Sequence, residues 1–260
     1  AVRETGLGNV PDKIKKNHNK TLGLLRDIKD VKSFGHVSED KDMGLSIYLR
    51  PKGVVAAIVP STNPLATPVN NIINALKCGN SIIVAPSPKG AQPFKELLVF
   101  IHKNLSMIGL DQDLVQMVPV PPSKGKTNRL MQLADMLVVT GSQNNVKAGY
   151  SSGTPALGVG QGNVVTIIDE TADTQAAAAK IAISKTFDNA TSCSSENSVI
   201  AIEEVYEETV QYLRDEGGLL LNDDEADRLI NIHWKNGKMT TDLLAQDINV
   251  IIDKVGLEKR

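Results

Sequence analysis

The residue best suited to covalent chemistry is Cys193, which lies in the polar segment 187–197. Its polar neighbours are Thr191, Ser192, Ser194, Ser195 and Glu196. These residues are too polar for a core segment, and a loop cysteine among them can react as a thiolate if backbone N–H groups or a helix N-terminus favour that form. The alternative is an inert loop cysteine, because free cysteine often packs as a small hydrophobe.

A second candidate group is the amide of Asn63, in the segment Val-Pro-Ser-Thr-Asn-Pro at 59–64. This segment follows an apolar strand, and open α/β sheets bind ligands beyond the carboxyl ends of their strands. Asn63 is either an ordinary turn residue before the helix-starting Pro64, or a donor that holds a developing oxyanion together with the backbone N–H of Cys193.

Cys78 fits the inert alternative. It follows an apolar helix predicted over 69–77 and precedes Gly79-Asn80, which is a helix stop, so we expect it to pack beside a C-cap.

The elements that must position these groups alternate regularly from Gly53 onward. Short apolar strands are predicted at 54–59, 81–85, 114–118 and 136–139, and helices at 64–77, 88–105, 123–134 and 143–151. Apolar strands without alternation, each followed by a helix, indicate a parallel sheet covered on both faces. The sequence therefore predicts an α/β fold with a doubly wound nucleotide-binding domain.

Three segments are expected along the chain. Residues 1–52 hold a polar helix at 11–30 and an extended segment at 45–50, and we expect them to make oligomer contacts. Residues 53–158 form the nucleotide-binding domain, and 159–260 the first part of an α/β catalytic domain. Its predicted elements are strands at 164–168 and 198–202, helices at 175–185 and 203–215, and an apolar β-like run at 250–252 that would end on an unpaired sheet edge.

Composition excludes several classes of protein. The net charge is −2 and no basic block is present, which argues against nucleic acid or an anionic membrane as partner. No transmembrane run is found, and two cysteines without an apolar leader predict a reducing cytoplasm. Four scattered histidines lack metal-ligand spacing, so no metal site is expected: His18, His36, His102 and His233.

Four ordered motifs resemble the CoA-acylating branch of the aldehyde dehydrogenase superfamily. They are Val-Pro-Ser-Thr-Asn-Pro at 59–64, Val-Val-Thr-Gly-Ser at 138–142, Ser-Ser-Gly-Thr-Pro-Ala-Leu-Gly-Val-Gly-Gln-Gly-Asn at 151–163 and Lys-Thr-Phe-Asp-Asn-Ala-Thr-Ser-Cys at 185–193. Within this branch the chain is similar to acylating sulfoacetaldehyde dehydrogenases and to the aldehyde domain of bifunctional aldehyde-alcohol dehydrogenases.

The resemblance implies Cys193 as nucleophile and Asn63 as the amide of the oxyanion hole. It implies NAD or NADP as cofactor, CoA as co-substrate, a small aldehyde as substrate and a homo-oligomer. Residues implied in cofactor binding are Pro60, Ser61, Thr62, Ser87, Lys89, Thr140, Gly141, Ser142, Gly158, Val159 and Gly160. A turn at a helix N-terminus attracts phosphate on physical grounds too, although Gly141-Ser142 is equally consistent with an ordinary N-cap.

Two departures from the hydrolytic branch of the family affect the chemistry. Where that branch carries the glutamate that activates water, this chain has Ala156, which favours transfer to a thiol over hydrolysis. Where it has a lysine and a glutamate beside the adenosine ribose, this chain has Ala85 and Pro88, so NADP is compatible. Lys89 either attracts a 2'-phosphate or is a solvated charge at a helix start.

The glycine-rich run 158–162 is predicted to be a close-approach loop near the thioester, with no strand directly before it. The hydroxyls of Thr191, Ser192, Ser194 and Ser195 could line a site for an anionic tail, which favours sulfoacetaldehyde over acetaldehyde, or they could cap turns. The rival functions are a filament-forming or scaffold protein with little activity and a cysteine hydrolase that uses His233.

Overall fold

The computed structural model describes residues 1–160 and 162–258, which form two compact units. The first, here the sheet unit, holds residues 14–160 together with Ala1 and Arg3–Thr5. The second, here the cysteine unit, joins residues 6–13 to residues 162–258. Helix α2 (Val10–Ile28) supplies residues to both units. None of the helices in the described part of the chain is long and apolar enough to cross a membrane.

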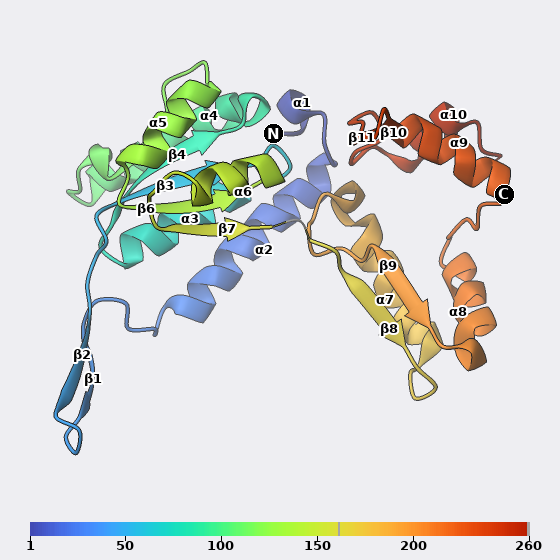
Figure 1. The fold of residues 1–260 in the computed structure, drawn as a ribbon, viewed down its shortest axis with the longest axis horizontal. Coiled ribbons are helices and arrows are strands. Elements are labelled where there is room, and N and C mark those ends of the chain that lie inside the picture. The colour runs from blue at the N-terminus through green and yellow to red at the C-terminus, as the bar shows by residue number, and fades with distance from the viewer. Residues whose placement is uncertain (161, 259–260) are drawn as a thin grey trace. The chain divides into compact units, whose positions relative to one another are not determined.

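A five-stranded parallel sheet forms the centre of the sheet unit, in the order β5-β4-β3-β6-β7 (Figure 1). Its strands are β3 (Val54–Val59), β4 (Ser81–Pro86), β5 (Val115–Met117), β6 (Met136–Thr140) and β7 (Ala156–Val159). The predicted doubly wound architecture is confirmed, because β3 starts at the middle of the sheet and the chain then builds outward in both directions. The switch point therefore lies between β3 and β6.

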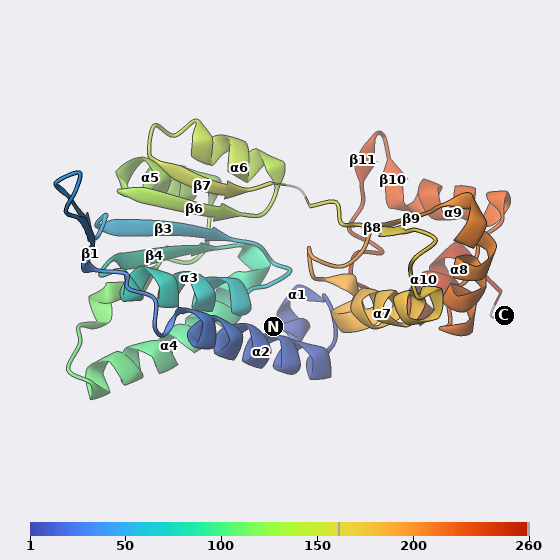
Figure 2. The ribbon, with the colours of Figure 1, turned by 90° about the horizontal axis from the view of Figure 1, so that it is seen from below.

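Helices cover both faces of this sheet, which explains its uniformly apolar strands (Figure 2). Helices α3 (Ala66–Lys77) and α4 (Ala91–Met107, preceded by the 3-10 turn η1 at Pro88–Gly90) pack on one face, where Phe94 is completely buried. Helices α5 (Lys124–Leu133) and α6 (Gln143–Tyr150) cover the other face through Met131 and Val146. An apolar cluster thus lies between the sheet and its helices on each face.

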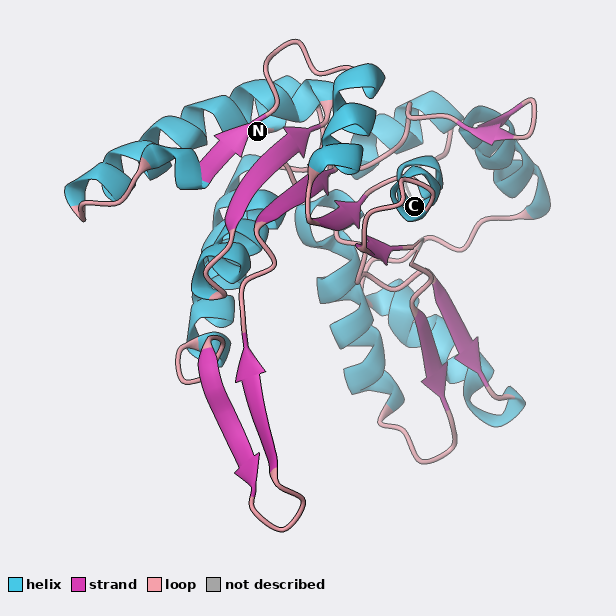
Figure 3. Ribbon diagram, turned by 60° about the vertical axis from the view of Figure 1, so that its left-hand side comes forward, coloured by secondary structure: helices cyan, strands magenta, loops and turns pink. Residues whose placement is uncertain are grey.

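A two-stranded antiparallel hairpin of β1 (Gly35–Asp40) and β2 (Leu45–Leu49) also belongs to this unit (Figure 3). The predicted extended segment at 45–50 is confirmed, but its partner strand was missed. Residues of β1 such as Ser38 and Glu39 are polar, so no alternation marks them as a strand, and cross-strand pairing alone orders them.

The cysteine unit contains a parallel pair of short strands, β8 (Val165–Ile168) and β9 (Ser198–Ala201), and helix α7 (Thr174–Thr186), which packs against α8 (Glu203–Asp215). The 3-10 turn η3 (Phe187–Ala190) follows α7. Its remaining elements are α9 (Asp223–His233), the two-residue strands β10 (Trp234–Lys235) and β11 (Lys238–Met239), and α10 (Ile248–Val255). A four-residue helix, α1 (Val2–Thr5), begins the chain.

Two sequence predictions about elements are wrong. The apolar run 250–252 belongs to helix α10, because Asp247 caps its start, Gly256 ends it in the left-handed conformation and the apolar residues recur at helical spacing. No sheet edge is left there. A strand does precede the glycine run: β7 pairs with β6 through Val159, so Gly158 and Val159 are strand residues.

Candidate active site

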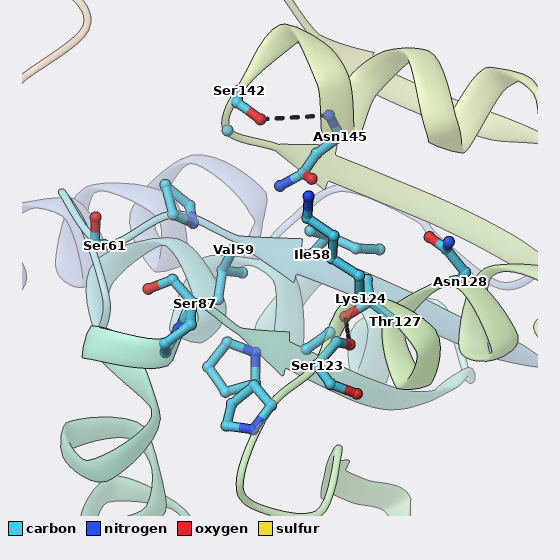
Figure 4. Close-up of a pocket in the computed structure, with 16 residues that line it drawn as sticks. Ile58, Val59, Ser61, Ser87, Ser123, Lys124, Thr127, Asn128, Ser142 and Asn145 are labelled. Carbon is cyan, nitrogen blue, oxygen red and sulfur yellow. Dashed lines mark hydrogen bonds between the residues drawn. The ribbon is translucent and has the colours of Figure 1, made fainter. Parts of the chain in front are cut away.

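A cavity of about 510 Å³ lies at the carboxyl ends of the parallel strands, beside the switch point (Figure 4). The ends of β3 and β4 contribute Val59 and Ala85, and the turn after β6 contributes Gly141. This is the position at which doubly wound sheets bind dinucleotides, because loops from both halves of the sheet diverge there.

Three serines on the wall of this cavity cap the helical segments that follow the strands. Ser87 accepts from the backbone N–H of Gly90, before α4, at 3.2 Å. Ser123 caps α5, and Ser142 caps α6 by accepting from the N–H of Asn145 at 3.4 Å (Figure 4). A neutral hydroxyl cap leaves the positive end of the helix dipole uncompensated, so each start remains attractive to an anion.

The charge of the side chains that line the cavity also favours an anionic ligand. Lys124 is its one charged side chain among the described residues, and the lining contains no carboxylate. Thr127 and Asn128 add further polar groups beside Lys124. A pocket with three serine-capped helix starts and a lysine fits a ligand that carries phosphates.

The structure divides the cofactor residues implied by the resemblance into two groups. Those that line the cavity are Pro60, Ser61, Ser87, Gly141 and Ser142. Those outside the lining are Thr62, Lys89, Thr140, Gly158, Val159 and Gly160. Lys89 is exposed in η1, whereas Lys124 was missed by the sequence analysis although the strand–Ser–Lys–helix pattern could have indicated it.

Gly141 and Gly158 have different structural reasons to be glycine. Gly141 has φ +152° in the turn between β6 and α6, a conformation that side chains disfavour. A Cβ on Gly158 would lie only 2.7 Å from Val146 Cγ1 and 2.8 Å from Tyr150 Cε2. Gly158 therefore makes a close approach to helix α6, and its approach to the thioester stays a prediction.

Asn63 lies in the bend between β3 and α3, where the Nζ of Lys16 donates to its Oδ1 at 3.0 Å. Lys16 is 2% exposed although it carries a charge. An ammonium group can only donate, so it fixes which end of the amide is oxygen and directs the NH₂ group elsewhere. Asn63 is therefore oriented as a hydrogen-bond donor, which is what an oxyanion-holding amide requires.

Cys193 is exposed and lies in the loop that follows η3. An exposed loop position is one that a substrate can reach, as a nucleophile requires. A Cβ on Gly162 would lie 3.2 Å from the carbonyl oxygen of Cys193, so the end of the glycine-rich run does approach this loop. One carboxylate oxygen of Glu196, three residues further on, is buried without a hydrogen-bond partner in the described structure.

The backbone before Cys193 is strained. Asp188, Asn189 and Ala190 have φ values of +53°, +50° and +56°, and none is glycine. A non-glycine residue in the left-handed region costs on the order of 1 kcal/mol or more, so three in succession persist only if the surroundings enforce them.

Residues near the N-terminus supply that enforcement. The Nζ of Lys13 donates to Asp188 Oδ2 at 2.8 Å, and the Thr191 hydroxyl donates to the same oxygen. The backbone N–H of Asn9 donates to Oδ1 at 3.2 Å, and the backbone N–H of Asp188 donates to Asp12 Oδ2 at 2.8 Å. The Asp188 side chain is completely buried and that of Lys13 is 7% exposed, so this is a buried, hydrogen-bonded ion pair.

Two other kinds of site that the sequence analysis considered are a metal site and a cysteine–histidine pair. No cluster of His, Cys, Asp and Glu that could hold a metal ion occurs among residues 1–160 and 162–258. Within the same residues no histidine is hydrogen-bonded to Cys193, so the pairing that a cysteine hydrolase uses is not observed.

Comparison with known proteins gives the family. The model for the aldehyde dehydrogenase family matches residues 16–227. The chain is 54% identical over 259 residues to an acylating sulfoacetaldehyde dehydrogenase of Cupriavidus necator, covering 100% of this chain and 52% of that protein. The chain therefore belongs to the aldehyde dehydrogenase family, and it spans about half the length of the curated relatives at the top of that comparison.

Two solved structures share the fold over 100% of the chain. An acetylating aldehyde dehydrogenase from Geobacillus thermoglucosidasius superposes with a TM-score of 0.94 at 35% identity, and 57% of that chain is covered. A propionaldehyde dehydrogenase from Rhodopseudomonas palustris, solved with bound propionyl-CoA, superposes with a TM-score of 0.88 at 30% identity, also over 57% of its length. The predicted aldehyde dehydrogenase fold is confirmed.

Proposed function

We propose that the full-length protein oxidises a short-chain aldehyde to an acyl-CoA with NAD or NADP, reversibly, through a thioester on Cys193. The observation that carries the proposal is an exposed cysteine on an anchored loop in a chain whose named relatives are acylating dehydrogenases. The serine-capped cavity fits a dinucleotide, and the same phosphate-binding features suit CoA.

The chain's own residues account for the covalent steps. The Cys193 thiolate adds to the aldehyde carbon and forms a C–S bond, and the Asn63 NH₂ group donates to the resulting oxyanion. A nicotinamide cofactor, which Ser87, Ser142 and Lys124 of the cavity would hold by its phosphates, would supply the hydride acceptor that oxidation of this carbon to the thioester requires. The CoA thiol then loses its proton and attacks the carbonyl, and Cys193 leaves as thiolate.

Ala156 supports thioester transfer over hydrolysis. It lies in β7, where it packs partly against the apolar cluster on the α6 face of the sheet. No carboxylate is present at the position that matches the water-activating glutamate of the hydrolytic branch, whereas a CoA thiol is acidic enough to need less help. Aldehyde oxidation should therefore depend on CoA.

The test measures products from the full-length protein with and without CoA. Acyl-CoA should be the main product and free acid a minor one, and Ala156→Glu should raise the acid fraction while lowering stability, because it inserts a charge beside apolar groups. Ala172→Glu, at a half-buried position in the bend before α7, is the control with the same substitution outside the sheet. Rapid acid formation by the unmodified protein in the absence of CoA would contradict the proposal.

We propose sulfoacetaldehyde as the substrate. Of the four hydroxyl side chains near Cys193 that the sequence analysis considered, only two support this choice. Thr191 donates to Asp188 and Ser195 is buried, which leaves Ser192 and Ser194 as the accessible hydroxyls. The similarity to an enzyme named for this substrate supports the choice. A kcat/KM for acetaldehyde that equals or exceeds that for sulfoacetaldehyde would instead indicate a general short-chain enzyme.

NADP and NAD are both compatible with the cavity. Its lining has no carboxylate to repel a 2'-phosphate, and Lys124 could pair with one, a role proposed for Lys89 on sequence alone. A homo-oligomer and a cytoplasmic location remain predictions. The scaffold alternative is less well supported, because the named relatives are enzymes.

A further inference from the structure

We propose that the buried pair Lys13–Asp188 is a positioning device for the nucleophile, through which the N-terminal segment 8–13 fixes the conformation that presents Cys193. The inference rests on the proposed function only in taking Cys193 as the reacting group. Neither residue is a candidate for contact with the substrate: Asp188 is completely buried, and the exposed cysteine lies five residues further along the chain.

The first argument is that the turn cannot hold itself. Its three left-handed residues need external partners, and segment 8–13 supplies three to Asp188: the backbone N–H of Asn9, the Nζ of Lys13 and the carboxylate of Asp12. Asn189 is held in the same way, since its Oδ1 accepts from Asn9 Nδ2 at 3.4 Å and its Nδ2 donates to the carbonyl of Ala245.

The second argument is that the pair connects directly to the cysteine loop. Thr191, only two residues before Cys193, donates its hydroxyl to Asp188 Oδ2, and Lys13 Nζ lies 3.4 Å from that hydroxyl. A displaced Asp188 carboxylate would therefore move Thr191 and with it the backbone that carries the thiol. Displacement of a reacting atom by about 1 Å can reduce turnover on the order of 100-fold.

Gly8 offers a way to displace the carboxylate without changing any charge. It has φ +72°, and a Cβ built on it would overlap Asp188 Oδ1 and lie 3.1 Å from Lys13 Cε. Gly6 has nearly the same conformation, φ +68°, with nothing within 4 Å of its Cβ position. Gly8→Ala and Gly6→Ala therefore share the backbone strain and differ in contact with the ion pair.

The experiment compares these two variants in the full-length protein by steady-state kinetics and by the rate at which iodoacetamide alkylates Cys193. Relative to Gly6→Ala, Gly8→Ala should lower kcat about 10- to 100-fold and alter the alkylation rate at least about fivefold, while KM for the nicotinamide cofactor changes less than about twofold. Equal kcat and equal alkylation rates in two folded variants would overturn the positioning role.

A second pair of variants decides the matter if Gly8→Ala does not fold. Lys13→Met removes the buried charge, and Lys15→Met removes an exposed one from the same helix. The double variant Lys13→Met, Asp188→Asn should recover part of the kcat lost by Lys13→Met, because it removes the buried negative charge that Lys13 balances. Unchanged kcat and alkylation in Lys13→Met would overturn the proposal.

Failure of the proposed function would be visible separately. If the unmodified protein forms no acyl-CoA, that function is wrong, but the alkylation rates still report whether the ion pair controls Cys193. If acyl-CoA forms and Gly8→Ala behaves as Gly6→Ala in both measurements, the function stands and the positioning role is wrong.

Discussion

The cavity of the sheet unit and the loop of the cysteine unit are built on different principles. The cavity is made by the ends of regular elements, since strands β3, β4 and β6 stop in register and serines start the helices that follow. The loop before Cys193 is irregular and is held by the backbone N–H of Asn9 and the side chain of Lys13, about 180 residues earlier in the chain. Binding surfaces can thus follow from topology alone, whereas the loop of the proposed nucleophile is held by particular long-range contacts.

Two helix caps beside the cavity differ in charge from two caps in the cysteine unit. Ser123 and Ser142 start α5 and α6 beside the cavity, whereas Asp173 and Asp247 start α7 and α10 in the cysteine unit. A carboxylate cap neutralises the helix start, and a hydroxyl cap does not. The starts of α5 and α6 beside the cavity therefore remain available for a phosphate-bearing ligand.

The largest expected effect is the loss of aldehyde oxidation when the thiol of the cysteine unit is replaced. Cys193→Ser should lower aldehyde oxidation by at least about 1,000-fold, because a serine hydroxyl is a far poorer nucleophile near neutral pH. Cofactor affinity, measured by fluorescence titration, should remain within about twofold, since the cavity lies in the other unit. Cys78→Ser is the control at the second free cysteine, and substantial turnover by a folded Cys193→Ser would remove the assignment.

Lys16→Met tests whether the sheet unit also contributes to the chemical step. The ammonium group orients the Asn63 amide, and an oxyanion donor is worth about 100- to 1,000-fold in kcat, so loss of its orientation should lower kcat about 10- to 100-fold. Lys20→Met, at an exposed position of the same helix, should leave kcat unchanged. A Lys16→Met enzyme with normal kcat and a normal fold would contradict the role of Asn63.

Exchange of serine and aspartate at the helix caps tests whether a neutral cap beside the cavity favours cofactor binding. Ser142→Asp keeps a capping oxygen but places a carboxylate in the cavity, so it should weaken cofactor binding about tenfold with little change in Tm. The reverse change, Asp173→Ser, should leave that affinity unchanged because it lies in the cysteine unit. Equal affinities in Ser142→Asp and the unmodified protein would show that the helix starts do not hold the phosphates.

The smallest effect concerns pH. A hydrogen bond from the backbone N–H of Asn249, followed by one from its side chain, lowers the pKa of Asp247. Because the folded pKa is below the usual value of about 3.9, the cap stabilises α10 at higher pH and this contribution disappears as the pH falls through the folded pKa. Asp247→Asn should therefore make amide exchange in α10 less sensitive to pH between about 2 and 5, with Asp253→Asn as the exposed control.

The sequence by itself determined the regular parts of this protein. Uninterrupted apolar runs such as Val54–Val59 require burial on both faces, and serines or a Gly after the strands mark the helix starts and turns, so the sheet and its ligand-binding edge could be predicted. The type and setting of Cys193 also predicted a nucleophile loop, and the structure places this cysteine at an exposed position. These features are local in the chain, and local propensity or periodicity encodes them.

Only the tertiary structure showed what holds the two candidate catalytic groups. Lys13 and Lys16 look like solvated charges in the sequence, because a lysine at helical spacing is usually exposed, yet both are buried against partners far along the chain. The left-handed turn at Asp188 likewise has no glycine to signal it. No local pattern records such pairings, since a buried charge is stable only where folding brings its counter-group within hydrogen-bond distance.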